Sequence, residues 1–128
     1  MPLYTVSTRN QLPKEAKADI AMMITDVHCG HTAAPRTFVQ VLFSENAPLN
    51  KGIELHIYAS VRAGRTLKIN DGIEEDMVNQ MCELSGYNLK QIEFALFNVP
   101  ASWIMEGGAI LPEPGEEAEW LEKHNHAG

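Results

Sequence analysis

The sequence has few of the groups that crosslink a chain, give it positive charge or anchor it in a membrane. Cys29 and Cys82 are its only two cysteines, and they show neither a disulfide framework nor a paired CxxC spacing. The 17 acidic residues outnumber the 10 basic ones, so the formal net charge is -7. This charge argues against a nucleic-acid binder, which needs a basic surface.

Long apolar runs are also missing. No run approaches the roughly 18–20 residues that would span a bilayer. A secretory signal typically has a basic stretch followed by an apolar one, and the first residues lack this pattern. We therefore expect a reduced, cytoplasmic protein that binds neither nucleic acid nor membrane.

The chain has enough apolar residues for a core of its own. Hydrophobic residues make up 45% of its 128 residues, close to the average for globular proteins. We expect a single domain over 1–128, with a first β-α-β unit at 1–50, a second at 51–106 and a C-terminal tail at 107–128.

The first unit begins with a predicted strand at 2–8 and a predicted helix at 12–31. Apolar residues recur in the helix at three- and four-residue spacing, and we expect Gly30 to end or loosen it. The β-branched and aromatic run at 36–45 predicts a well-buried strand. The apolar stripe of the helix consists of Ala16, Ile20, Met23, Ile24 and Val27.

The second unit repeats this order. Residues 53–62 alternate between apolar and polar side chains, which predicts a strand with one apolar face. A helix is predicted at 64–86, where Gly72 costs about 1 kcal/mol relative to alanine. A fourth strand is predicted at 91–100.

Two such units predict an α+β (α/β) fold, with one four-stranded sheet and both helices on one face. The other face of the sheet is then uncovered, while the strands carry several phenylalanines. An uncovered apolar face predicts oligomerisation. The phenylalanines are Phe38, Phe43, Phe94 and Phe97.

The tail is rich in glycine, proline and glutamate. We expect it either to wrap over a neighbouring subunit, with Trp120 and Leu121 as anchors, or to end in disorder. The His-Asn-His run at 124–126 is expected to lie in its flexible part.

Pro2 is a candidate catalytic group. If Met1 is removed, Pro2 exposes a secondary amine that can take or give a proton. Burial and nearby cations lower the pKa of such an amine, and a nearby carboxylate raises it. If Met1 stays, the nitrogen is an amide and this role disappears.

Arg62 and Arg65 are candidate substrate-binding residues. Arg62 ends the third predicted strand and Arg65 follows in the turn, with Gly64 between them. Two guanidiniums there can bind a carboxylate through paired hydrogen bonds, next to the N-terminus of a helix. The alternative is a pair of solvated arginines.

His28 and Glu106 complete the candidate set. His28, near the end of the first predicted helix, can donate a hydrogen bond or transfer a proton, or can simply be a helix-terminal histidine. Glu106 follows the last strand and can activate water or polarise the proline amine, or be an ordinary loop glutamate. His31 lies three residues after His28, but Gly30 intervenes and no further ligand is near, so no metal or other cofactor is expected.

These residues, in this order, resemble the tautomerase superfamily and the group around cis-3-chloroacrylic acid dehalogenase. The resemblance is carried by the proline after Met1, "ITDVH" at the helix end, "RAGRT" after the third strand and "LPEPGEE" in the tail. It runs from Pro2 to about Trp120, nearly the whole chain.

The resemblance implies a trimer of paired β-α-β units with an active site around each N-terminal proline. It implies that Arg62, Arg65 and His28 bind and polarise the carboxylate of an unsaturated acid. Glu106, with a tyrosine, would activate water for attack at C3, and Pro2 would deliver a proton to C2.

Two departures affect the water-activating half of this site. The position of the family tyrosine falls on Ala95, and the Tyr-Gly-Arg after the glutamate is here Gly107, Gly108 and Ala109. Loss of a positioned proton-transfer group commonly costs 10²–10⁴-fold in rate. The residues expected to bind the carboxylate are all present.

We therefore expect a cofactor-free tautomerase or isomerase that moves protons on small 2-oxo or unsaturated carboxylic acids. Weak hydratase or dehalogenase activity on 3-haloacrylates is expected beside it, in a homotrimer. One alternative is a non-catalytic trimeric binding or structural member of the superfamily, which Ala95 and Ala109 favour. A metal-dependent hydrolase using His28 and His31 is another.

Overall fold

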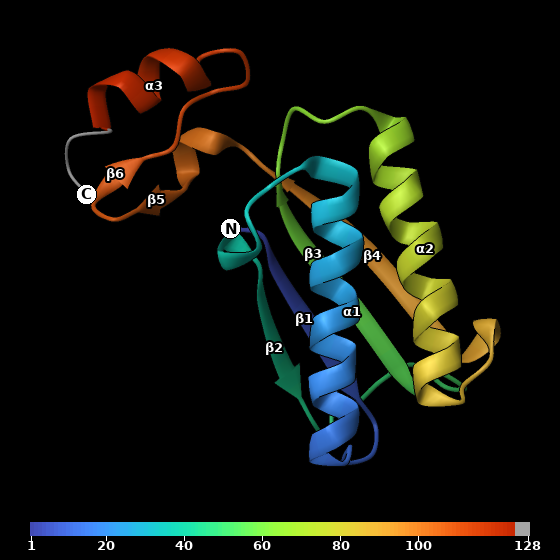
Figure 1. Cartoon of the computed structure of the whole chain (residues 1–128). Helices are drawn as coiled ribbons and strands as arrows, with labels where there is room; N and C mark the ends of the chain where they lie inside the picture. Colours follow the sequence, from blue (N-terminus) through green and yellow to red (C-terminus); the bar gives the residue numbers. More distant parts are fainter. Residues whose placement is uncertain (125–128) are drawn as a thin grey trace.

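The computed structural model describes residues 1–124, which form a sheet, two long helices and a small C-terminal hairpin with a third helix (Figure 1). No helix in this range is long and apolar enough to cross a membrane. Short 3-10 turns precede β2, β4 and β5. The elements are β1 (Leu3–Thr8), α1 (Lys14–Thr32), β2 (Gln40–Ser44), β3 (Leu55–Arg62), α2 (Leu67–Ser85), β4 (Ile92–Val99), β5 (Met105–Glu106), β6 (Ala109–Ile110) and α3 (Glu117–His124).

The main sheet has the strand order β2-β1-β3-β4. β1 pairs in parallel with β2, and β3 pairs in parallel with β4, as expected for two β-α-β units. The two units meet through the antiparallel pair β1–β3. α1 and α2 both lie on one face of this sheet (Figure 1), so the predicted fold class is confirmed.

The core lies between that face and the two helices. The alternation predicted for β3 is seen directly: Leu55, Ile57 and Val61 are fully buried, while Tyr58 is exposed. The register sets Val6 of β1 opposite Ile57, so the central strands bury the same face. The helices contribute buried side chains from one stripe each: Ile20, Met23, Ile24 and Val27 from α1, and Ile73, Met77 and Met81 from α2.

Gly30 does not end the first long helix, so the helix end expected there was wrong. α1 continues to Thr32 and ends at Ala33, which adopts a left-handed φ of 60° and donates its N–H to the carbonyl of Cys29. A glycine inside a helix costs only about 1 kcal/mol, which tertiary packing can offset. α2 ends at Gly86, as expected.

Gly72 has a packing role inside α2. A Cβ at this position would lie 2.8 Å from Cε1 of His31, which belongs to α1. His31 also contacts Asp76 of α2, with 2.6 Å between Nε2 and Oδ2. The glycine therefore gives the His31 ring room between the helices, which offsets its low helix propensity.

β2 is shorter and less buried than expected. It begins at Gln40, because residues 36–38 form a 3-10 turn after Pro35, and its residues alternate between exposed and half-buried. It pairs only with β1 and so forms an edge of the sheet. The prediction of a well-buried strand was therefore wrong, since an edge strand is covered by a neighbour on one side only.

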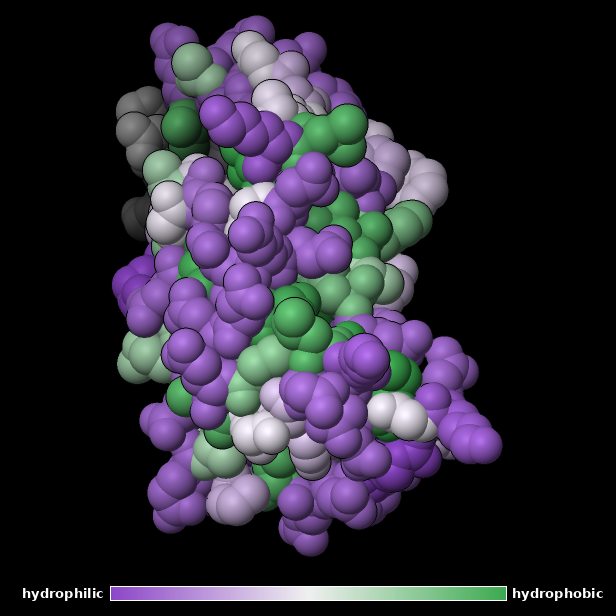
Figure 2. All heavy atoms as spheres, turned by 90° about the vertical axis from the view of Figure 1, so that its right-hand side faces the viewer, coloured by the Kyte–Doolittle hydropathy of each residue, from purple (hydrophilic) through white to green (hydrophobic). Residues whose placement is uncertain are grey.

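The sheet face away from the helices carries a few exposed apolar side chains. Leu42, Tyr58 and Phe97 are exposed there, at 55%, 40% and 44%. Phe43 and Phe94 instead pack against the core. Figure 2 shows another side of the molecule, the one that faces right in Figure 1, where hydrophobic patches lie between hydrophilic residues.

The C-terminal segment folds onto its own chain. β5 and β6 form a hairpin, and the indole N–H of Trp120 in α3 donates to the carbonyl of Ile110 at 2.7 Å. Leu121, the other expected anchor, is exposed at 55%. The His-Asn-His run begins at His124, the last residue of α3, and its other two residues lie outside the described part of the chain.

A matched pair of leucines tests where stability resides. We expect Leu55→Ala, in the fully buried centre of β3, to lower the free energy of unfolding by about 2–5 kcal/mol. Leu67→Ala removes the same atoms from a side chain that is 80% exposed and should change it by less than about 0.5 kcal/mol. Urea denaturation at one fixed protein concentration measures both, and equal losses would contradict this assignment of the core.

Candidate active site

Three distant segments of the chain meet at one end of the sheet. β1 begins with Leu3 opposite Ser60 of β3, and the two strands are antiparallel, so the first two residues run toward the end of β3. Arg62 ends β3 and lies opposite Val99 of β4. The chain after β4 then returns through β5, which carries Glu106 (Figure 1).

These segments enclose a cavity of about 430 Å³. Pro2, Arg62, Arg65 and Glu106 all line it, so four of the five candidate residues share one cavity. Apolar parts of the wall come from the turn before β2 and from the C-terminal segment. These apolar wall residues include Phe38, Leu111 and Pro112.

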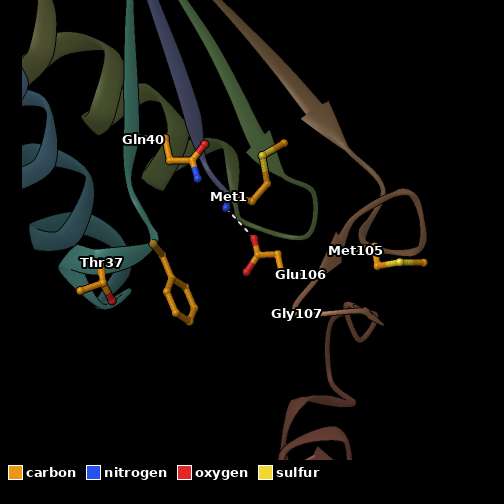
Figure 3. Close-up of a pocket in the computed structure, with 7 residues that line it drawn as sticks. Met1, Thr37, Gln40, Met105, Glu106 and Gly107 are labelled. Carbon is orange, nitrogen blue, oxygen red and sulfur yellow. Dashed lines mark hydrogen bonds and ion pairs between the residues drawn. The ribbon is translucent and has the colours of Figure 1, made fainter. Parts of the chain in front are cut away.

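Glu106 binds the amino terminus of the chain. The ammonium group of Met1 lies 2.5 Å from Oε1 of Glu106, which projects from β5 (Figure 3). Both residues line the cavity and also a neighbouring hollow of about 440 Å³, which lacks the arginines. With Met1 present, the Pro2 nitrogen is an amide, and its carbonyl accepts the N–H of Gln40 at 3.0 Å.

Arg62 and Arg65 differ in their partners. Nη2 of Arg62 lies 3.4 Å from Oε1 of Glu117, the first residue of α3. Arg65 donates from Nη1 to the carbonyl of Arg62 at 3.2 Å and has no carboxylate partner among residues 1–124. Burial, followed by the charge of Arg62, lowers the pKa of Arg65. A partly buried cation without a counter-charge therefore borders the cavity.

Gly64 allows the C-terminal segment to close over this loop. Its φ is +110°, a conformation that disfavours other residues, and a Cβ would lie 2.3 Å from Cγ of Pro114. Pro114 precedes α3, which carries Glu117. The glycine between the arginines is thus required both by the turn and by the contact that brings Glu117 near Arg62.

His28 is not among the residues that line this cavity, and it lies in the core. It is fully buried, and its Nδ1 lies 2.7 Å from the hydroxyl of Tyr4 in β1. Burial, followed by the effects of Arg65, the amino terminus and His31, lowers the pKa of His28 to about 4. His28 is therefore neutral at pH 7, and its Nε2 has no hydrogen-bond partner in the described residues.

Tyr4, the hydrogen-bond partner of the candidate residue His28, was not predicted from the sequence. A signal was present, because Tyr4 occupies a core-facing position of the first strand, two residues after Pro2. A buried tyrosine usually needs a hydrogen-bond partner for its hydroxyl. Burial raises the pKa of Tyr4, so this hydroxyl remains protonated.

His28 and His31 both lie near the C-terminus of α1, but their surroundings differ. His28 lies one turn before the end of α1 and inside the core, whereas His31 is in the last turn and pairs with Asp76. Among residues 1–124, no group of three His, Cys, Asp or Glu side chains is placed to hold a metal ion.

The positions that depart from the family pattern have clear local roles. Ala95 lies in β4 opposite Tyr58, on the sheet face away from the helices, and does not line the cavity of the single chain. Gly107 and Gly108 adopt positive φ values of 59° and 81° and form the tight turn between β5 and β6. Ala109 pairs with Glu106 across that hairpin.

Comparison with known proteins gives matches only at the level of structure. No family model and no curated protein sequence matches the chain. The structure is similar to that of N1, a member of the cis-3-chloroacrylic acid dehalogenase family, with a TM-score of 0.82 and 29% identity over 94% of this chain and 90% of N1.

Two further structures extend this likeness. Native Ps01740 has a TM-score of 0.74 and 28% identity, over 81% of this chain and 99% of Ps01740. An asymmetric trimer of the F6 fused 4-OT shares the fold, with a TM-score of 0.77 and 20% identity over 84% of this chain and 94% of that one. With this fold and a likeness to N1 that spans nearly its whole length, the chain resembles the tautomerase superfamily and, within it, the cis-3-chloroacrylic acid dehalogenase family.

Proposed function

We propose that the chain is a cofactor-free isomerase that moves a proton on a small 2-oxo or unsaturated carboxylic acid, with Pro2 as the proton-transfer group once Met1 is removed. The observation that carries this proposal is the single cavity lined by Pro2, Arg62, Arg65 and Glu106. The likeness to tautomerase-superfamily enzymes supports an isomerase or tautomerase.

The arginines are proposed to bind the substrate carboxylate. Arg65 lacks a carboxylate partner in the described residues, and Arg62 has only a long contact of 3.4 Å with Glu117. A partly desolvated guanidinium gains most from a planar, bidentate partner such as a carboxylate. The apolar wall formed by Phe38 and Leu111 can hold the carbon skeleton.

Pro2 is proposed to transfer the proton. In the reaction of an enol, the secondary amine accepts the proton of the 2-hydroxyl group and returns a proton to C3, which yields the 2-oxo acid with no net change in composition. Glu106 already binds the terminal amine of the chain. After removal of Met1, the same carboxylate would lie near the amine of Pro2 and hold its protonated form.

Hydration or dehalogenation of a 3-haloacrylate is proposed as a weaker activity of this site. Glu106 can activate water, but Ala95 and Ala109 supply no hydroxyl or guanidinium to assist it. We propose a homotrimer as the active form, because a fused 4-OT with this fold is an asymmetric trimer and the open sheet face exposes Leu42, Tyr58 and Phe97. Residues 1–128 are proposed to form one domain.

A non-catalytic binding or structural member remains the second candidate. Retention of Met1 would favour it, because Pro2 would then be an amide. The mass of the purified protein separates the two candidates. A mass lower by one methionine residue supports the enzyme, and a retained Met1 supports the second candidate.

Replacement of the proline tests the proposed proton-transfer group. We expect Pro2→Ala to lower kcat on phenylenolpyruvate by about 10²–10⁴-fold, the usual contribution of a positioned acid–base group. Pro13→Ala is the matched control, because Pro13 precedes α1 and is exposed outside the cavity. Absorbance at steady state measures both variants, and a Pro2→Ala rate equal to that of the wild type would exclude Pro2 from the reaction.

Replacement of Arg65 tests whether this residue binds the substrate carboxylate. We expect Arg65→Ala to raise KM about 10- to 100-fold, because a hydrogen bond to a charged group contributes about 1.5–3 kcal/mol. Arg36→Ala is the control: Arg36 pairs with Asp26 on the surface, outside the cavity. An unchanged KM for Arg65→Ala, measured with the same substrate, would place the carboxylate elsewhere.

Glu117 is expected to compete with the substrate for Arg62. Its own amide and that of Gly115 hydrogen-bond the carboxylate and, with Arg62, lower the pKa of Glu117, so it is ionised at pH 7. We expect Glu117→Gln to lower KM about two- to fivefold at constant kcat, the range of a weak exposed ion pair. Glu119→Gln, in an exposed pair with Lys123 on the same helix, should leave KM unchanged. A raised KM for Glu117→Gln would mean that Glu117 assists binding.

A further inference from the structure

Tyr4 and His28 form a buried pair in the core, and the charge of Arg65 acts on both of them. Both side chains are fully buried. The hydroxyl of Tyr4 lies 2.7 Å from Nδ1 of His28, and the two rings meet edge to face at a centroid distance of 5.6 Å. This contact joins the start of β1, next to Pro2, to the C-terminal part of α1.

The direction of this hydrogen bond follows from the donors and acceptors that each group has. The hydroxyl of Tyr4 has one proton, and Nδ1 of His28 is its only hydrogen-bond partner among residues 1–124. If Nδ1 were the donor, the hydroxyl proton would be buried without an acceptor, which costs about 1–3 kcal/mol. Tyr4 therefore donates and Nδ1 accepts, so the neutral ring carries its proton on Nε2.

The Nε2–H group is then a buried donor with nothing to bind. Nε2 of His28 has no partner in the described residues. Oδ1 of Asn70 is a buried acceptor that is also without a partner, so these two atoms do not bond each other. Buried polar atoms are nearly always paired, and an exception needs a reason.

The charges around His28 indicate what this donor would bind. Arg65, the amino terminus and His31 act on it, and all three favour negative charge nearby. Arg65 and Met1 also line the cavity, so two of these charged neighbours belong to the candidate site. An oxygen atom of an anion held at Arg65 is a fitting acceptor for the Nε2–H group.

We propose that Tyr4 is a positioning residue: its hydroxyl holds His28 in the neutral Nε2–H form, so that this N–H donates to an oxygen of the carboxylate or enol bound at Arg65. The proposal rests on the proposed function for the identity of the ligand. In this form His28 stabilises negative charge on oxygen without giving up its proton, which is an electrostatic role and not that of a general acid.

Nitrogen NMR of histidine-labelled protein tests the first half of the proposal without any turnover. We expect His28 to show the Nε2–H tautomer and no titration between pH 5 and 8. Tyr4→Phe keeps the ring but removes the donor, so the Nδ1–H tautomer should appear and the pKa of His28 should rise. An Nδ1–H tautomer in the wild type, or an unchanged tautomer in Tyr4→Phe, would overturn the proposal.

Tyr87→Phe is the matched control for these spectra. Tyr87 follows the C-terminus of α2, at the opposite end of that helix from Arg65, and it packs against the core. The substitution removes the same single hydroxyl group. It should leave the tautomer and the pKa of His28 as they are in the wild type, and a change equal to that of Tyr4→Phe would point to a general loosening of the fold and overturn the specific role.

Binding of a saturated carboxylate tests the second half. We expect 3-phenylpropanoate, which cannot tautomerise, to shift the Nε2–H resonance of His28 in the wild type and to shift it much less in Tyr4→Phe. Binding that depends on Arg65 but leaves this resonance unmoved would overturn the proposed donation. If 3-phenylpropanoate does not bind at all, the proposed function and the donation to a ligand both fail, while the tautomer still decides whether Tyr4 positions His28.

Kinetics give a readout that simple destabilisation would not. We expect Tyr4→Phe to lower kcat on phenylenolpyruvate about 10-fold or more, with a smaller change in KM, because the donor matters most when negative charge develops on oxygen. Tyr87→Phe should keep both constants. A Tyr4→Phe variant with wild-type kcat and a shifted tautomer would overturn the link between Tyr4 and the reaction.

Discussion

The antiparallel pairing of β1 with β3, at the centre of the sheet, is the constraint on which the site depends. It joins two parallel β-α-β units and directs the amino terminus toward the end of β3, where Arg62 lies. The register also sets the side chain of Tyr4 into the core. A slip of one residue would turn every β1 side chain to the opposite face, and Tyr4 would lose its contact with His28.

Around the cavity, the charges of the chain are nearly but not fully matched. Glu106 binds the terminal amine, and Glu117 contacts Arg62. Arg65 is left with a backbone carbonyl as its partner. Because removing a guanidinium from water without a counter-charge is costly, this imbalance favours binding of an anion. The two carboxylates come from the C-terminal segment, so this segment sets the charge of the cavity as well as its shape.

The fold was largely predictable because it depends on short-range patterns. The strict alternation at 53–62 and the apolar stripe at 12–31 are periodicities that only one secondary structure satisfies, and both became buried faces. Predictions failed where tertiary packing outweighed local preference. α1 runs through Gly30, and β2 is a half-exposed edge strand although its sequence is typical of a buried one.

The sequence by itself determined the two-unit architecture, the acidic charge and the set of residues capable of proton transfer and carboxylate binding. Only the tertiary structure decided which of them meet. It brings Pro2, Arg62, Arg65 and Glu106 to one cavity, because strand pairing acts between residues far apart in the sequence. It also places His28 in the core, with the hydroxyl of Tyr4 as its hydrogen-bond partner. Burial and hydrogen-bond direction are properties of the packed chain, so no local pattern of residues could have fixed the state of that histidine.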